Sequence, residues 1–394
     1  MELPKFQVLA VAPSFTTFAL KPSIPAVTHT LGSLVVYTRG RRWALSDPAN
    51  NITISKAREK RLIICSKLSC DSREASGNFG RGSPLGSALM LDPRETERRN
   101  PRTASIDLAS PLEIVDMINA EDRRVPEVVA TQREQIARAI EFAEATFRAG
   151  GRLFYVGAGT SGRLGVLDAS EIPPTFGANP EMVQGIIAGG LPALTRAQEG
   201  AEDVVEDGAH VMDEHGVGGK DFVIGIAASG TTPYVRAALE RAAALGAKTG
   251  IVACSPPPAD LVAKVDVTML PIVGPEVVTG STRMKAGTAT KLVLNTITTG
   301  AMIRLGKTYG NLMVDLRATN NKLVDRSQRI VMEVTGISRD EATRLLGRAG
   351  KSVKIAIVMQ KKGVSREEAE RMLAQNGGVV RRVTKDEPPP IRER

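Results

Sequence analysis

Hydroxyl side chains gather in two glycine-containing segments, and each segment follows an apolar run. The first is GAGTSG (157–162) and the second is ASGTT (228–232), which directly precedes Pro233, a good first helical residue. Hydroxyls at the start of a helix join unpaired backbone N–H groups and the positive end of the dipole, which together suit a phosphate monoester. The candidate phosphate-binding residues are Gly159, Thr160, Ser161, Ser229, Gly230, Thr231 and Thr232.

Two other interpretations of these segments have to be weighed. The first segment matches the GxGxxG pattern of dinucleotide-binding proteins, which expects an acidic residue about 20 positions later to hold the ribose. The second apolar run instead ends IAGG (187–190), without an acid, so the sequence favours a phosphate over a dinucleotide. Ordinary helix capping, for which one hydroxyl is enough, stays open for both segments.

A third polar segment, GPEVVTGSTRMK (274–285), leads into a long helical pattern. Taken alone, it fits a capped helix as well as it fits a ligand-binding loop. If it binds the same ligand as the other two segments, its polar side chains supply further contacts. The candidates from this segment are Glu276, Ser281, Thr282 and Lys285.

The elements that would position these segments follow a regular order. Apolar runs alternate with helical patterns, and runs that are apolar throughout indicate strands buried on both faces. We therefore predict an α/β fold with a doubly wound parallel sheet, which places ligands at the carboxyl ends of its strands. The runs are 153–156, 185–188, 222–228, 249–254 and 267–273. The helical patterns are 127–149, 194–206, 233–244 and 286–305.

Residues 1–89 differ from the rest of the chain in charge and pattern. They contain twelve Lys and Arg residues but five Asp and Glu residues, so most of the formal charge of +9 belongs to them. They lack helical or strand periodicity, and we predict a disordered extension. A translation start placed too early, with Met90 as the true beginning, is the favoured explanation; an organellar transit peptide is the alternative.

The chain from about residue 325 shows a different pattern. The segments SRDE (338–341) and SREE (365–368) read as capping boxes, each opening a short helix, and an apolar helix near 353–359 lies between them. This predicts a small three-helix C-terminal domain. We accordingly divide the chain into the extension at 1–89, the α/β domain with its leading helices at 90–324, and the helical domain with its tail at 325–394.

Composition argues against several classes of protein. Aromatic residues make up 4% of the chain, which leaves little to stack on bases, and residues 1–89 show no helix-turn-helix, so we expect no nucleic-acid partner. Three cysteines and three histidines argue against a disulfide scaffold or a His/Cys metal site. The longest apolar runs fall short of the roughly 18–20 residues of a membrane span. We therefore expect a cytoplasmic protein without a membrane partner.

Longer runs of the sequence resemble a known family. GTSGRLG, ASGTTPYV and GPEVVTGSTRMKAGTATK resemble the sugar isomerase (SIS) phosphosugar-binding fold. VGAGTSGRLGVLDASEIPPTFG, IAGG, EGAED and GNLMVDLRATNNKL resemble the N-acetylmuramic acid 6-phosphate etherase family in particular. The resemblance covers residues 97–385 and implies that the α/β domain is an SIS catalytic domain. The sequence departs from the pattern at Thr231, where related enzymes often carry arginine.

The resemblance implies a carbon–oxygen lyase that needs no metal or other cofactor. The sugar opens to an aldehyde, a base removes the acidified C2 proton, and an acid protonates the departing lactyl oxygen on C3. Water then adds across the double bond, giving N-acetylglucosamine 6-phosphate and D-lactate in the recycling of cell-wall amino sugars. By this resemblance Glu171 is the acid, and Glu202 acts on the C2 proton or the incoming water.

Two questions stay open on the sequence. A non-catalytic phosphosugar-binding regulatory protein on the same fold is the alternative function, and such a protein does not need both glutamates. If 161–171 is one helix, Glu171 lies about 15 Å from its phosphate-binding end, too far for one hexose phosphate. Either that helix is shorter, or a partner subunit supplies one carboxylate; we expect the second, a homodimer with composite active sites.

Overall fold

The protein is described here by a computed structural model that covers residues 36–38, 41–43, 92, 94–316 and 321–390. Its contacts divide the chain into two units, Met1–Ser87 and Ala88–Arg394. In the first unit, β1 (Val36–Thr38) pairs with β2 (Arg41–Trp43) in antiparallel fashion. The prediction that residues 1–89 are disordered otherwise lies outside the described residues.

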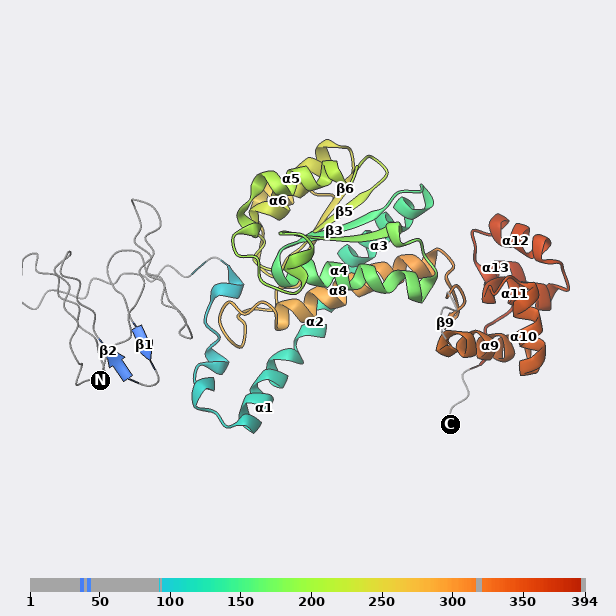
Figure 1. The fold of residues 1–394 in the computed structure, drawn as a ribbon, viewed down its shortest axis with the longest axis horizontal. Coiled ribbons are helices and arrows are strands. Elements are labelled where there is room, and N and C mark those ends of the chain that lie inside the picture. The colour runs from blue at the N-terminus through green and yellow to red at the C-terminus, as the bar shows by residue number, and fades with distance from the viewer. Residues whose placement is uncertain (1–35, 39–40, 44–91, 93, 317–320, 391–394) are drawn as a thin grey trace, which may run out of the picture. The chain divides into compact units, whose positions relative to one another are not determined.

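A five-stranded parallel sheet forms the centre of the second unit (Figure 1). Its strand order is β4-β3-β5-β6-β7, and every neighbouring pair is parallel. Every residue of the two central strands β3 and β5 is buried, as expected for a sheet covered on both faces. The predicted doubly wound α/β fold is confirmed. The strands are β3 (Leu153–Gly157), β4 (Val183–Ile187), β5 (Phe222–Ile226), β6 (Lys248–Val252) and β7 (Val267–Met269).

Helices cover the sheet from two sides (Figure 1). Along β3, Phe154 faces one helical layer and Tyr155 the other, because successive side chains of a strand point to opposite faces. The layer around Phe154 contains α5 (Val205–Glu214), α6 (Pro233–Ala244) and α7 (Ala259–Val262). The layer around Tyr155 contains α3 (Arg133–Arg148), α4 (Gly159–Phe176) and α8 (Lys285–Arg304).

The order of the strands changes direction between β3 and β5. From β3 the chain continues to β4 on one side, whereas from β5 it continues to β6 on the other. Open α/β sheets bind ligands at the carboxyl ends of the strands that flank such a switch point. The segments 157–162 and 228–232 begin at or just after the ends of these two strands. The fold therefore brings both predicted phosphate-binding segments to the same edge of the sheet.

Two predicted helices differ from those observed. The pattern at 127–149 is divided into two helices at Thr131 and Gln132, and the Gln132 side chain accepts a hydrogen bond from the Leu270 N–H (2.9 Å). The predicted helix at 194–206 is wrong: two short 3-10 turns precede α5, and Gly200, at φ +79°, interrupts the pattern. The observed helix and 3-10 turns in these two regions that have not yet been given bounds are α2 (Val125–Ala130), η5 (Leu191–Leu194) and η6 (Ala201–Asp203).

The segment before the sheet consists of short turns and one exposed helix. Ser110 and Glu113 form a complete capping box at the start of that helix, α1. The elements are η1 (Glu95–Glu97), η2 (Pro101–Thr103), η3 (Ile106–Leu108) and α1 (Pro111–Asp122). Within the described part of the chain, none of the helices combines the length and apolar character that a membrane span requires.

The C-terminal helices enclose an apolar core of their own. The three predicted helices are present, but two more pack with them, so the three-helix count is too small. The first additional helix is an amphipathic segment, and the predicted boundary at 324/325 falls inside it. The helices are α9 (Asn321–Thr335), α10 (Arg339–Arg348), α11 (Val353–Lys362), α12 (Arg366–Gln375) and α13 (Val380–Thr384). A hairpin of β8 (Thr308–Tyr309) and β9 (Leu312–Met313) precedes them.

The two predicted capping boxes differ in completeness. Ser338 and Glu341 form both reciprocal hydrogen bonds at the start of α10. At α12 the Ser365 hydroxyl accepts from the Glu368 N–H (3.2 Å), but the Glu368 carboxylate pairs with Arg371. Both helices therefore begin where the sequence predicts, although only the first box is complete.

Candidate functional site

The first hydroxyl-rich segment forms the sharp turn between β3 and α4. Gly157 has to be glycine here, because a Cβ atom would lie 2.7 Å from the Gly162 nitrogen. Thr160 and Ser161, both half-buried, lie in the first turn of α4, and the N-cap residue Ala158 makes no side-chain hydrogen bond. The first backbone N–H groups of α4 thus lack a side-chain cap of the usual kind.

The second segment opens α6 in the same way. Thr232 is the N-cap residue, but its hydroxyl makes no capping hydrogen bond, and Pro233 is the first helical residue. Ser229 Oγ and Thr231 Oγ1 lie 3.1 Å apart, and the Thr231 N–H donates to Ser229 Oγ (3.3 Å). Gly230 between them adopts φ +75°. Ordinary N-capping therefore does not account for the hydroxyls of either segment.

The third segment is organised differently, around a buried carboxylate. Glu276 is fully buried, and its two oxygens accept from the backbone N–H groups of Lys285 (3.1 Å) and Ala286 (2.9 Å) at the start of α8. Burial raises the pKa of Glu276, while the two N–H groups act in the opposite direction. The capped-helix interpretation, which the sequence left open, therefore holds for Glu276.

Lys285 also takes protein partners. Its side chain is 1% exposed, and its ammonium group donates to Glu121 Oε2 (2.6 Å) and to the Val273 carbonyl (3.0 Å). In this structure the side chains of Glu276 and Lys285 hold the segment in place, and both were predicted to bind the ligand. The hydroxyls of Ser281 and Thr282, which are half-buried on the same segment, make no hydrogen bond to another described residue.

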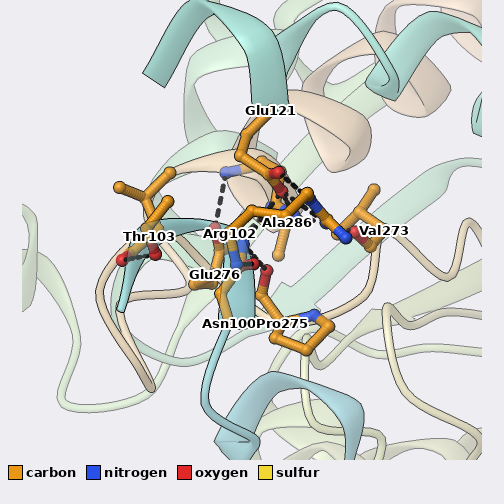
Figure 2. A network of polar contacts seen from close by, with 10 residues as sticks. Asn100, Arg102, Thr103, Glu121, Val273, Pro275, Glu276 and Ala286 are labelled. Atoms are coloured by element: carbon orange, nitrogen blue, oxygen red, sulfur yellow. Dashed lines mark hydrogen bonds and ion pairs between the residues drawn. The ribbon is translucent and has the colours of Figure 1, made fainter. Parts of the chain in front are cut away.

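A buried network that the sequence did not predict surrounds Glu121 (Figure 2). Besides Lys285, the Glu121 carboxylate accepts from Arg102, with Nη2–Oε2 at 2.9 Å, and from Asn100 Nδ2 (3.0 Å). The hydrogen bond from Arg102 is the main cause that lowers the pKa of Glu121 to about 2. The residues come from η2, α1 and α8, so the network fastens the N-terminal segment to the start of α8.

The three segments lie at the carboxyl edge of the sheet. A Cβ atom on Gly287, in α8, would lie 3.7 Å from Thr160 Cγ2, so the first turns of α4 and α8 are in contact. Gly230 lies against Ser255 and Pro257, where a Cβ atom would be 3.0 Å from the Ser255 carbonyl and the Pro257 Cα. The first and third segments are therefore in contact, and the second segment follows the neighbouring strand β5 at the same edge of the sheet.

The two predicted catalytic glutamates lie on exposed surface. Glu171 belongs to α4 and Glu202 to η6. Because α4 continues without a break from Gly159 to Phe176, the shorter helix is excluded. Ten residues separate Glu171 from Ser161, a rise of about 15 Å along the helix. A single chain therefore holds Glu171 well away from the first phosphate-binding turn.

Apolar side chains lie exposed near both glutamates. Leu167, one helical turn before Glu171, is 49% exposed, and Leu191, on the loop that follows β4, is 80% exposed. Val204 and Val205 directly after η6 are exposed as well. Leu167 neighbours Glu171 along α4, and Val204 neighbours Glu202 along the chain; exposed apolar side chains are a common feature of interaction surfaces.

A buried aspartate fixes α4 against α8 beneath this surface. Asp168 accepts hydrogen bonds from Asn295 Nδ2 (2.5 Å) and from Thr298 Oγ1 (3.0 Å). Burial raises its pKa, and the hydrogen bonds from Asn295 and Thr298 partly oppose that rise. Asp168 lies one turn before Glu171, so this contact also sets the orientation of the helix that carries the glutamate. Among the described residues, no group of three His, Cys, Asp or Glu side chains could hold a metal ion.

Comparison with known proteins identifies close relatives. A family model described as the glucokinase regulatory protein N-terminal SIS domain matches residues 135–243. The N-acetylmuramic acid 6-phosphate etherase of Synechococcus elongatus is 54% identical over 263 residues, which cover 66% of this chain and 85% of that protein. The enzyme of the same name from Salinibacter ruber is 55% identical over 277 residues, which cover 70% of this chain and 89% of that protein.

Solved structures show a more distant likeness. A phosphoheptose isomerase from Neisseria gonorrhoeae is 17% identical, with a TM-score of 0.35, and the match covers 49% of this chain and 98% of that chain. A phosphoheptose isomerase from Francisella tularensis is also 17% identical, with a TM-score of 0.36 and coverage of 48% and 98%.

Proposed function

The chain belongs to the N-acetylmuramic acid 6-phosphate etherase family, and we propose that it cleaves the D-lactyl ether of this substrate by elimination and hydration. The products are N-acetylglucosamine 6-phosphate and D-lactate, which makes the protein a carbon–oxygen lyase of amino-sugar recycling. One observation carries the assignment of the site: two hydroxyl-rich turns end β3 and β5, and neither helix that follows has a side-chain cap.

The phosphate of the substrate would bind at these two turns. Backbone N–H groups at the start of α4 and α6 point toward the edge of the sheet, and an anion there is stabilised by the helix dipole. Thr160, Ser161 and Ser229 supply hydroxyl donors to the phosphate oxygens. Ser281 and Thr282 lie on the neighbouring segment and are available to the sugar.

Glu171 and Glu202 would carry out the proton transfers. Glu171 protonates the lactyl oxygen as the C3–O bond breaks, and Glu202 acts on the C2 proton or on the water that adds to the double bond. Carboxyl groups suit this work because the ionised form accepts a proton and the protonated form donates one. The family resemblance supports these two roles. In a single chain, however, both glutamates are exposed, and the proton transfers need them to be shielded from water.

We propose that a homodimer supplies that shielding and that its active sites are composite. The unbroken helix α4 and the exposed apolar side chains around both glutamates support this arrangement. A partner subunit seated there would cover the glutamates and bring one carboxylate to a sugar held by the other subunit.

Mixing two inactive variants tests the composite site. Glu171→Ala and Glu202→Ala chains are unfolded together, refolded as a mixture and compared with each variant refolded alone. If the two glutamates of one site come from different subunits, the mixture recovers about a quarter of wild-type activity, since half the dimers are mixed and each has one intact site. Recovery no greater than in the separate samples would sink the composite site.

The regulatory protein remains the second candidate, because the matching family model describes a regulatory protein's SIS domain. Turnover of N-acetylmuramic acid 6-phosphate in ¹⁸O-labelled water separates the two. Elimination followed by hydration places the label in the sugar product and leaves the lactate unlabelled. Label in the lactate contradicts this mechanism, and a complete lack of turnover favours the regulator.

We also propose a cytoplasmic location. Cys254 is a free, fully buried thiol, which suits a reducing compartment, where thiols stay reduced. Fractionation of cells that produce the full chain tests this: activity in an organellar or membrane fraction would contradict it.

A further inference from the structure

The segment 94–103, called the strap below, runs along the edge of the candidate site. The Thr96 N–H donates to Ser255 Oγ (3.3 Å), beside the second hydroxyl-rich turn, and the Thr96 carbonyl accepts from the Gly280 N–H (3.1 Å) in the third segment. Thr103 Oγ1 donates to the Val277 carbonyl (2.8 Å). In Figure 1 the cyan strap accordingly lies beside the orange loop that precedes α8.

The strap is held in place by buried groups. Asn100 Nδ2 donates both to Glu121 (3.0 Å) and to the Pro275 carbonyl (3.2 Å), and Arg102 pairs with Glu121 (Figure 2). Thr96, Asn100 and Thr103 are all buried. Removing one member of a buried, charged hydrogen-bond network is costly, so the strap is a fixed wall of the site and does not act as a loose tail.

One acidic side chain of the strap faces the third segment. A Cβ atom on Gly280 would lie 3.2 Å from Glu97 Oε2, and Gly280 stands between Thr279 and Ser281 at φ +74°. The other oxygen, Oε1, accepts from Thr96 Oγ1 (3.2 Å). Among the ion pairs of the described residues Glu97 takes part in none, whereas Glu95, on the same turn, pairs with Arg98 (2.6 Å).

We propose that Glu97 is a further substrate-contacting residue, which accepts hydrogen bonds from hydroxyl or amide N–H groups of the sugar. The inference rests on the proposed function, because it takes the substrate to lie at this edge of the sheet. An ionised carboxylate only accepts hydrogen bonds and repels a phosphate, so Glu97 would face the sugar and not the phosphate. It would help to select amino-sugar phosphates over the phosphate group alone.

Two ligands separate this role from a merely structural one. Binding of N-acetylglucosamine 6-phosphate and of inorganic phosphate is measured by calorimetry on the full chain and on Glu97→Gln, alongside the melting temperature. Loss of one charged hydrogen bond should weaken binding of the sugar phosphate about 10-fold, while binding of inorganic phosphate stays unchanged or improves. The KM for N-acetylmuramic acid 6-phosphate should rise by a similar factor.

Glu95→Gln is the matched control. It removes the same charge from the same turn, but its carboxylate is already paired with Arg98, so binding of both ligands should match the wild type. The proposal is overturned if Glu97→Gln binds the sugar phosphate like the wild type, or if it weakens both ligands equally. If the wild type binds the sugar phosphate but turns over no substrate, the proposed function fails while Glu97 is still tested by the binding data.

Discussion

Helices α4, α6 and α8 all begin at the carboxyl edge of the sheet, but their first turns differ. At α8 the protein supplies its own anion, because the Glu276 carboxylate accepts from the first two helical N–H groups. At α4 and α6 the N-cap residues Ala158 and Thr232 make no side-chain hydrogen bond. A helix start whose N–H groups already bind a buried carboxylate cannot bind a substrate phosphate as well. This difference supports our proposal that the phosphate binds at α4 and α6, whereas the residues at the start of α8 hold the third segment in place.

The largest expected effect of a substitution on stability is at α8. Lys285→Met removes the buried cation that pairs with Glu121. Arg102 is then the remaining charged partner of Glu121. We expect the free energy of unfolding to fall by about 3 kcal/mol, the lower end of the range for breaking a buried ion pair. Urea unfolding measures it. Lys291→Met, an exposed lysine of the same helix, is the control and should change stability by less than about 0.5 kcal/mol. If the two substitutions change the unfolding free energy equally, Lys285 does not have the proposed structural role.

Substitutions in the first turn of α4 should reduce activity and leave stability almost unchanged. Thr160→Val with Ser161→Ala removes two hydroxyls that we propose bind the phosphate, so kcat/KM should fall about 100-fold, mostly through KM. The unfolding free energy should change by less than about 0.5 kcal/mol, because these hydroxyls do not cap the helix. Ser170→Ala is the matched control, since Ser170 is exposed near the other end of the same helix. If the Thr160→Val, Ser161→Ala variant loses stability but keeps normal kinetics, these hydroxyls stabilise the helix and do not bind the phosphate.

Lowering the pH should destabilise the Glu121 network at the start of α8, with a smaller change in unfolding free energy than Lys285→Met causes. The pKa of Glu121 is lowered from 4.5 to about 2, mainly by Arg102, so the stability that Glu121 contributes is complete above pH 4.5 and is lost as the pH falls toward 2. One proton gives a slope of at most about 1.4 kcal/mol per pH unit. In Glu121→Gln the slope between pH 4.5 and 2 should become shallower by that contribution. If the pH dependence of the unfolding free energy, measured by urea unfolding, is the same in Glu121→Gln and the wild type, the pKa of Glu121 is not lowered in the folded protein.

The sheet and the two hydroxyl-rich turns could be predicted because each has a local signal. The strands are continuous apolar runs, and GAGTSG and ASGTT follow two of them directly. In contrast, no motif marks Glu121 or Arg102, and Lys285 was predicted to bind the ligand. Only the folded chain shows that Glu121 and Lys285, 164 positions apart, form a buried pair. The same limit applies to Glu276, because the sequence gives no means of telling a carboxylate that binds a ligand from one that caps a helix. It applies as well to Glu97, which no motif singled out.

A structure of the full chain with bound N-acetylglucosamine 6-phosphate would locate both the phosphate and the sugar. We expect the phosphate to lie between the first turns of α4 and α6, within hydrogen-bonding distance of Ser161 and Ser229, with the sugar facing Glu202 and a Glu171 carboxylate. A phosphate at the start of α8, in contact with Lys285, would contradict it. So would a sugar that leaves both glutamates in bulk solvent in every subunit.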